Sequence, residues 1–195
     1  MQAAAVAEAE PAARSTPRAE VWLRGNPRPA IIALAAISAA VAAAAATAVA
    51  IRPPGWVTAI LATSGVAGLL AAVAFVWAAS RPRLACRGGV VEVRLAPLGV
   101  HRVPLDVVEC VFPGSQPLAG EAGEDAARRV NTLVLRLAER AAEWRARPVA
   151  AAWGSWEDGN VVLDGRWCEP LTPALIREVS TRLLEARRRV APGPR

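Results

Sequence analysis

A long uncharged segment limits what this chain of 195 residues can fold into. Between Pro29 and Ser80, 51 of the 52 residues are uncharged, and the exception is Arg52. The segment contains two apolar stretches of about 20 residues each, which is the length that an α-helix needs to cross a bilayer. A soluble helix of this length carries a polar face, and neither stretch has one. The sequence therefore predicts a membrane hairpin rather than a simple soluble enzyme.

The two stretches are predicted to be antiparallel transmembrane helices. In the first, 30–51, 13 of the 22 residues are alanine. Alanine contributes little to membrane insertion, so we expect this helix to need a partner. The second stretch, 57–80, carries more large aliphatic side chains and is predicted to be that partner. Residues 52–56 contain two prolines and a glycine, which predicts a short external loop between the helices.

Tryptophan and arginine positions predict how the hairpin lies in a membrane. Trp56 and Trp77 are 21 residues apart, about 31 Å along a helix, which places one indole at each membrane interface. Four arginines precede the first stretch, and Arg81, Arg83 and Arg87 follow the second. These three are expected at the interface, where anionic lipid attracts them. Because cytoplasmic flanks are rich in arginine, both termini of this multi-pass protein are predicted to lie in the cytoplasm, with the hairpin in the inner (cytoplasmic) membrane.

The N-terminal segment, 1–29, is predicted to be a disordered cytoplasmic tail. It is rich in alanine, glutamate, proline and arginine and has no sustained apolar period. Trp22, two residues before Arg24, is expected to rest on the membrane as an interfacial anchor. Two alternatives for the apolar segment are a soluble alanine-rich hairpin and a cleaved signal peptide. The first would need a polar face, and a signal peptide would be shorter, would start earlier and would not be followed by a second span.

Charge and cysteine content exclude some kinds of partner. Residues 81–195 contain 18 arginines and 14 acidic residues, a net charge of +4. The acidic residues are interspersed among the arginines, whereas a nucleic-acid site clusters its basic residues, so no nucleic-acid partner is expected. The three cysteines form no Cys-x-x-Cys pair. We expect reduced, buried thiols, and neither a disulfide framework nor a metal site.

Residues 81–190 are predicted to form a cytoplasmic domain. Apolar and polar residues alternate in 90–95 after two glycines and again in 131–137, which is typical of short antiparallel strands. Residues 113–129 are predicted to be a polar loop. At the end, Thr172 is a good helix N-cap before Pro173, and a stripe of aliphatic residues follows at helical spacing. An amphipathic C-terminal helix over 172–190 is therefore expected, with a short tail at 191–195.

One short motif in this domain is similar to a known family. Residues 102–111, Arg-Val-Pro-Leu-Asp-Val-Val-Glu-Cys-Val, resemble a segment of bacterial pleckstrin-homology-like (PH-like) domains. Many of those domains follow a two-helix membrane hairpin, and the order here matches. The resemblance covers roughly 81–190. It implies an α+β membrane protein whose PH-like antiparallel β-barrel or split sheet is closed by the C-terminal helix. It also implies a binding or assembly module, and it brings no catalytic residues.

Residues suited to catalysis are few. His101 is the only histidine, and no nucleophile motif, phosphate loop or dinucleotide fingerprint is present. Glu139 and Glu143 are four residues apart, which fits a solvated helix face or a pair of carboxylates. The apolar stretches contain no ionisable residue that could relay a proton or an ion. The chain is therefore expected to be neither an enzyme nor a transporter and to need no cofactor.

The tryptophans of the domain allow two interpretations. Either they fill its core, or they form an aromatic patch for a partner or a membrane. They are Trp144, Trp153, Trp156 and Trp167. From these patterns the expected function is a membrane-anchored, non-enzymatic PH-like binding or assembly module at the cytoplasmic face. It would bind a protein partner or lipid headgroups, and a protein partner is favoured. The alternatives are a structural subunit of a larger membrane complex and an enzyme with an unrecognised carboxylate site. The sequence specifies neither the partner nor the oligomeric state.

Overall fold

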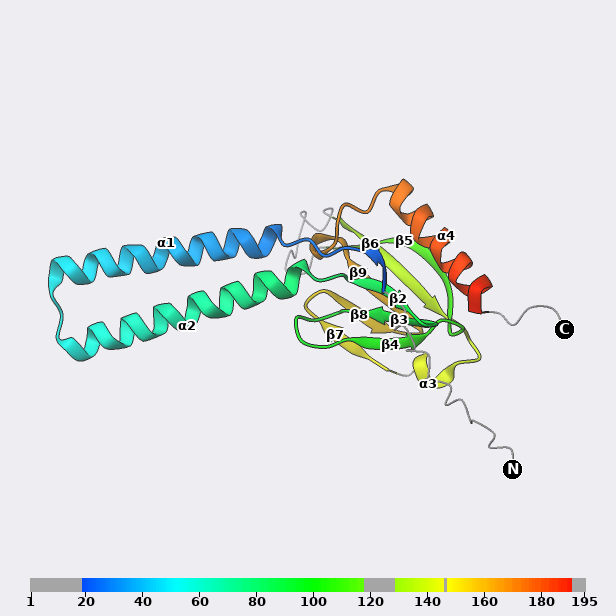
Figure 1. Ribbon diagram of the computed structural model, residues 1–195, viewed down its shortest axis with the longest axis horizontal. Helices are drawn as coiled ribbons and strands as arrows, with labels where there is room; N and C mark the ends of the chain where they lie inside the picture. Colours follow the sequence, from blue (N-terminus) through cyan, green and yellow to red (C-terminus); the bar gives the residue numbers. More distant parts are fainter. Residues whose placement is uncertain (1–18, 118–128, 146, 191–195) are drawn as a thin grey trace, which may run out of the picture.

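Two long antiparallel helices project from one side of an α+β domain (Figure 1). The computed structural model describes residues 19–117, 129–145 and 147–190. The helices are α1 (Arg28–Ile51) and α2 (Gly55–Ser80), and both are long and apolar enough to cross a membrane. They match the predicted helices and extend each by two residues at the start. Trp56 consequently lies in the first turn of α2 and not in the connecting loop.

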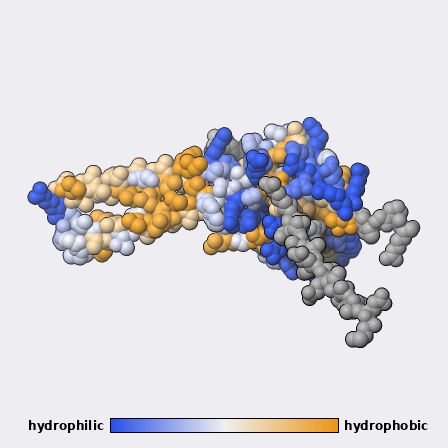
Figure 2. Space-filling model, viewed as in Figure 1, coloured by the Kyte–Doolittle hydropathy of each residue, from blue (hydrophilic) through white to orange (hydrophobic). Residues whose placement is uncertain are grey.

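The ends of these helices follow from their sequence. Pro29 lies in the first turn of α1, where a missing N–H removes no hydrogen bond. Arg52 adopts a left-handed conformation (φ 51°), and the prolines that follow cannot continue the helix. Within the helices, Ser38 and Thr63 donate their hydroxyl protons to carbonyls four residues earlier. These hydroxyls are thus satisfied within their own helices, and Figure 2 shows mainly hydrophobic surface along the hairpin.

The first sheet contains four antiparallel strands, and its first strand precedes the hairpin in sequence. In spatial order they are β1 (Glu20–Leu23), β2 (Leu84–Arg87), β3 (Val90–Val93) and β4 (His101–Pro104). The prediction of a disordered tail over 1–29 is therefore wrong for β1, while residues 1–18 lie outside the described residues. β1 forms because the carbonyls and amides of β2 are free along one edge and because its Trp22 and Leu23 enter the core.

The second sheet contains five antiparallel strands in the order β5-β6-β9-β8-β7. Their bounds are β5 (Val108–Pro117), β6 (Arg129–Leu137), β7 (Val149–Ala151), β8 (Gly154–Glu157) and β9 (Asn160–Asp164), with a single turn of helix, α3 (Ala142–Arg145), after β6. The strand predicted at 131–137 is confirmed. The loop predicted at 113–129 is partly wrong, since β5 continues to Pro117, and 118–128 lie outside the described residues.

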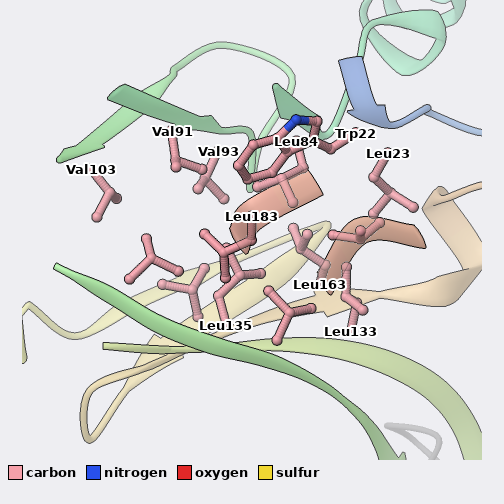
Figure 3. Packing of buried hydrophobic residues seen from close by; sticks show 14 of the residues in the cluster. Trp22, Leu23, Leu84, Val91, Val93, Val103, Leu133, Leu135, Leu163 and Leu183 are labelled. Atoms are coloured by element: carbon pink, nitrogen blue, oxygen red, sulfur yellow. The ribbon is translucent and has the colours of Figure 1, made fainter. Parts of the chain in front are cut away.

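The two sheets face each other over one hydrophobic core and do not close into a barrel (Figure 3). The split sheet that was predicted as an alternative to a barrel is the form observed. Alternate residues of the strands enter this core, among them Val91 and Val93 of β3 and Leu133 and Leu135 of β6. Each of these side chains is almost completely removed from water, at a gain of about 2 kcal/mol apiece.

The C-terminal helix α4 (Pro173–Val190) covers the core, after the short 3₁₀-helix η2 (Gly165–Trp167). The predicted cap is confirmed, because the Thr172 hydroxyl accepts a hydrogen bond from the Leu175 N–H at 3.2 Å. Val179, Leu183 and Ala186 form the buried stripe of this amphipathic helix. The polar face of α4 remains in solvent, in contrast to α1 and α2, which have no such face.

Candidate membrane-interface site

The base of the hairpin packs against the domain through a small hydrophobic cluster that is separate from the main core. Ala78 and Ala79 of α2 are buried against Trp153, with Phe75 and Trp167 packed beside them. The Phe75 ring meets Trp167 edge to face, with 5.7 Å between centroids, and lies 6.2 Å from Trp153. Such pairs stabilise beyond the area that they bury. We call this cluster, together with Arg83, the junction.

Hydrogen bonds also hold the chain where it enters α1 and where it leaves α2. The Arg83 N–H donates to the Leu23 carbonyl and the Asn26 N–H to the Trp167 carbonyl, both at 2.9 Å. At Gly25 the backbone passes so close to the last turn of α2 that a Cβ would collide with a carbonyl oxygen there. The hairpin is therefore attached to the domain through both connections, and neither is a free linker.

Arg83 is fully buried at the junction, although arginine rarely leaves water. Its Nε donates to the Trp167 carbonyl at 2.9 Å, and its Nη2 donates to the Ala79 carbonyl at 3.2 Å. Its guanidinium carbon lies 3.4 Å from the centroid of the Trp153 ring. One side chain thus connects the last turn of α2, η2 and the turn between β7 and β8.

Burial alters the ionisation of this guanidinium. Desolvation lowers the pKa of Arg83 to about 10, with repulsion from Arg94 acting in the same direction and Cys168 opposing it. Arg83 therefore remains a cation at neutral pH. It forms no ion pair with a carboxylate in the described ranges, and its Nη1 has no hydrogen-bond partner there. The carbonyl end of α2 and the face of the Trp153 ring stabilise the charge instead.

Trp77 and Arg81 continue the site on the outside of α2. The Trp77 side chain is 59% exposed, and the Arg81 guanidinium carbon lies 3.8 Å from the centroid of its ring. Indoles and arginines at a helix end are typical of a membrane–water interface. Arg94 lies beside Arg83, since its N–H donates to the Arg83 carbonyl at 3.0 Å. Partial burial and the charge of Arg81 lower the pKa of Arg94, and Glu92 opposes this effect.

Trp56 lies at the other end of α2 and is 69% exposed. The structure thus places Trp56 and Trp77 at opposite ends of one helix, as their spacing predicts. Their assignment to the two interfaces of a bilayer stays a prediction.

Three of the six predicted interface residues lie elsewhere than expected. Trp22 is 2% exposed and points into the core from β1, so it is no interfacial anchor. Arg83 is buried, as described. Arg87 is exposed, but it ends β2, about 10 Å along the strand from the end that follows α2. Trp22 was misplaced because residues 20–23 form a strand of the domain and not part of a disordered tail. The strand expected at 84–87 is confirmed as β2, and it carries Arg87 away from the end of α2, while Arg83 is drawn into the junction.

The residues considered for catalysis do not converge. His101 is partly exposed and packs edge to face on Trp156, with 5.6 Å between centroids. Glu139 pairs with Arg136 at 3.4 Å, and Glu143 lies in the first turn of α3. Among the described residues, no group of three His, Cys, Asp or Glu side chains could hold a metal ion. His101 and Glu139 thus make packing and ion-pair contacts with neighbouring side chains. The expectation that the chain is not an enzyme stays a prediction.

The cysteines differ in their surroundings. Cys86 and Cys168 are buried and Cys110 is exposed, so the expectation of buried thiols is wrong for Cys110. Burial raises the pKa of Cys168 to about 12, and its thiol contacts the Asp164 carbonyl oxygen at 3.3 Å. Burial also raises the pKa of Cys86. Both buried thiols are therefore neutral and unreactive at physiological pH.

The domain tryptophans are interior residues and not an exposed patch. Trp153 and Trp156 are fully buried, and the other two are half-buried. The Trp156 indole donates to the Trp144 carbonyl at 2.9 Å, and the two rings stack with 6.1 Å between centroids. Trp156 belongs to the core, whereas Trp153 and Trp167 build the junction.

A groove of about 820 Å³ runs between α1 and α2. Its walls are mainly aliphatic and alanine side chains, and its polar lining residues are Arg52, Thr58 and Ser64. Gly65 of α2 faces Val41 of α1 at a point where a Cβ would already be tight. The helices thus touch at small residues and leave apolar surface between them.

Comparison with protein-family models, with curated proteins and with solved structures finds no match for this chain.

The sequence alone did not identify the residues that surround the Arg83 side chain in the domain. Trp153 and Trp167 are far from the hairpin in sequence, and only the fold brings them to its base. A signal for the burial of Arg83 was present, however. Leu84 and the two residues after it are consecutive apolar residues, which is typical of a strand covered on both faces, and Arg83 immediately precedes that strand.

Proposed function

We propose that this chain is a membrane-anchored, non-enzymatic module that binds a protein partner at the cytoplasmic face. The junction is the observation that supports it best. A simple anchor needs only a flexible linker, whereas here Arg83, Gly25 and the aromatic cluster fix the domain against the helices. A fixed orientation presents the same domain surface at a set height above the bilayer, which lowers the cost of binding a partner that is itself in the membrane.

The proposed location is the inner (cytoplasmic) membrane, with the hairpin crossing it twice and both termini in the cytoplasm. The exposed aliphatic side chains of both helices support this, for example Ile32 at 70% and Leu70 at 65%. So does the arginine distribution, since Arg81 and its neighbours flank the hairpin at the domain end. In water these surfaces would be an aggregation hazard, whereas in lipid they are already solvated.

We also propose that the domain is PH-like. Two antiparallel sheets and an amphipathic C-terminal helix support this assignment. The motif at 102–111 spans β4 and the start of β5, and its aliphatic positions Val103, Leu105 and Val108 are buried in the core. In this chain the two sheets are open, with four and five strands, and β1 precedes the hairpin in sequence.

The groove between α1 and α2 favours a second candidate, a structural subunit whose hairpin packs into a larger membrane complex. The alanine-rich walls would admit another transmembrane helix at close range. In this case the partner would be held by the hairpin, and the domain would only cap the assembly.

A hairpin exchange separates the two candidates. Residues 34–71 are replaced by an unrelated two-helix hairpin of equal length, so that the junction is retained. The whole chain and the exchanged chain are then cross-linked in native membranes and purified in mild detergent, with the unrelated hairpin alone as the control.

A protein that co-purifies with both chains, and not with the control, supports the binding module. A protein that is lost on hairpin exchange supports the structural subunit. If neither chain retains a protein beyond those found with the control, both candidates are wrong.

A further inference from the structure

The loop between β3 and β4 carries the most exposed large hydrophobic side chain in the described residues. Residues 95–100, Leu-Ala-Pro-Leu-Gly-Val, are all uncharged, and Leu98 at their centre is 92% exposed. Gly99 adopts φ 133°, which only glycine takes readily, and no atom of another residue would lie within 4 Å of a Cβ there. The tip of the loop therefore projects away from the rest of the domain.

This loop lies at the end of the domain that faces the hairpin. Arg94, which precedes it, is hydrogen-bonded to Arg83 at the base of α2, and the next residue, Leu95, accepts a hydrogen bond from the Trp153 N–H at 3.0 Å. Trp153 in turn packs on Ala79 in the last turn of α2. In Figure 1 the green loop that joins β3 to β4 reaches toward the end of α2. The loop thus starts beside the last turn of α2.

We infer that Pro97 and Leu98 insert into the headgroup–acyl boundary of the leaflet from which α2 emerges. The inference rests on the proposed membrane-spanning hairpin. The bilayer is the occupant because the loop follows Arg94, whose charge lies near that of Arg81, and Arg81 in turn stacks on the exposed Trp77 at the end of α2. These cations and this indole match the phosphates of anionic lipid and the headgroup region. An isolated exposed leucine needs no explanation, but Leu98 projects from a loop whose base is hydrogen-bonded to Arg83 and Trp153 beside the end of α2, and lipid there would solvate it.

Insertion of this loop gives the domain a third membrane contact. The junction fixes the domain against α1 and α2, but the hairpin and the domain could still tilt together relative to the bilayer. A loop that inserts into lipid beside the end of α2 restricts this tilt. The arrangement therefore combines with the junction to define which surface of the domain faces the cytoplasm.

A fluorescence-quenching experiment on the full chain in lipid nanodiscs tests this inference. In a Cys110→Ser background, which leaves two buried thiols, single cysteines are placed by Leu98→Cys, Arg87→Cys and Leu70→Cys. Each is labelled with bimane. The bilayer is phosphatidylcholine and phosphatidylglycerol, with or without phosphatidylcholine that carries a nitroxide near its headgroup or along its acyl chain.

Residue 87 is the matched control, because it is exposed at the opposite end of the same β2–β3 hairpin. Residue 70, in the middle of α2, reports on the hairpin itself. We expect headgroup nitroxide to quench the label at 98 and to leave the label at 87 unchanged, and acyl-chain nitroxide to quench the label at 70.

Each other outcome has a definite meaning. An unquenched label at 98 together with a quenched label at 70 overturns the loop insertion and leaves the spanning hairpin intact. An unquenched label at 70 overturns the spanning hairpin itself. Equal quenching at 98 and 87 overturns the loop-specific contact, because the domain would then lie flat on the lipid.

Discussion

The hairpin and the domain are both rich in aliphatic residues, but the hairpin exposes these side chains and the domain buries them. Ile32 and Leu70 in the helices are 70% and 65% exposed, whereas Leu84 and Leu133 in the sheets are fully buried. The domain buries its apolar surface against itself, by strand alternation and by α4. The hairpin keeps its apolar surface on the outside, which is stable only where the surroundings are apolar too.

The junction joins the exposed apolar surface of the hairpin to the buried core of the domain. Its residue types differ from those of both regions. It contains a buried cation, two half- or fully buried tryptophans and the open carbonyl end of α2. Because Arg83 donates to the Ala79 carbonyl and places its charge at this end of the helix, α2 can end against protein rather than in water. Because these residues contact the end of α2 directly, the domain is built to pack against the base of the hairpin.

The largest expected effect comes from removing β1 from the domain. A fragment of residues 81–195 lacks Trp22 and Leu23, whose burial is worth about 4 kcal/mol together, so it should be partly unfolded or aggregated. A fragment in which residues 20–26 are joined to 82–195 by a short Gly-Ser linker should be soluble and rich in β-structure. Circular dichroism and size-exclusion chromatography compare the two. Equal stability would show that β1 is not part of the domain.

The next largest effect is expected in α4. Val179→Asp places a carboxylate in the core, where the residue is fully buried, and should lower the free energy of unfolding by about 4 kcal/mol. Leu184→Asp is the matched control, because Leu184 is 52% exposed on the same helix. Thermal unfolding of the full chain in detergent should separate the two by several degrees. Similar melting temperatures would mean that α4 does not pack on the sheets.

Arg83 and Arg87 lie four residues apart, one buried at the junction and one exposed, so their substitutions can be compared directly. Arg83→Ala should destabilise the chain by about 2–3 kcal/mol, since it leaves the buried Ala79 carbonyl without its donor and the Trp167 carbonyl with only the Asn26 N–H. Arg87→Ala should change stability by less than about 0.5 kcal/mol, because Arg87 is exposed. Tryptophan fluorescence should follow the loss selectively, as two indoles flank Arg83. Arg83→Lys should rescue only part of the stability, because an ammonium lacks the planar fork of arginine.

The smallest effect is expected in thiol chemistry. In the folded chain a maleimide should label Cys110 and spare the two buried cysteines, and in denaturant it should label all three. The raised pKa of Cys168, about 12, means that the folded thiol keeps a proton that the unfolded thiol loses near its ordinary value of 9.0. Its contribution to stability is therefore full below that value and is lost as the pH rises toward about 12. Rapid labelling of Cys168 at neutral pH would contradict its burial.

Much of the fold could be predicted because its signals are local. The absence of charge located α1 and α2, alternation located β3 and β6, and Thr172 with Pro173 located the start of α4. β1 could not be predicted in this way. Only four residues long, it shows no period of its own, and its edge pairing with β2 joins segments separated by the entire hairpin.

The candidate site was predicted less well for the same physical reason. Trp56, Trp77 and Arg81 were identified from rules that depend on distance to an apolar stretch, and those rules treat every flanking arginine alike. The burial of Arg83 depends on Trp153 and Trp167, which reach it only through the folded domain. A rule based on flanking charge cannot distinguish Arg83 from Arg87.

The central claim is that the apolar hairpin crosses a membrane and that the domain lies on the cytoplasmic side. Gly55 begins α2 at the far end of the hairpin, where a side chain would meet no other atom within 4 Å. In a Cys110→Ser background, Gly55→Cys and Arg87→Cys are each treated with a membrane-impermeant maleimide in intact cells and again after lysis. The account predicts that residue 55 is labelled in intact cells and that residue 87 is labelled only after lysis. Labelling of residue 87 in intact cells, with or without residue 55, would contradict it.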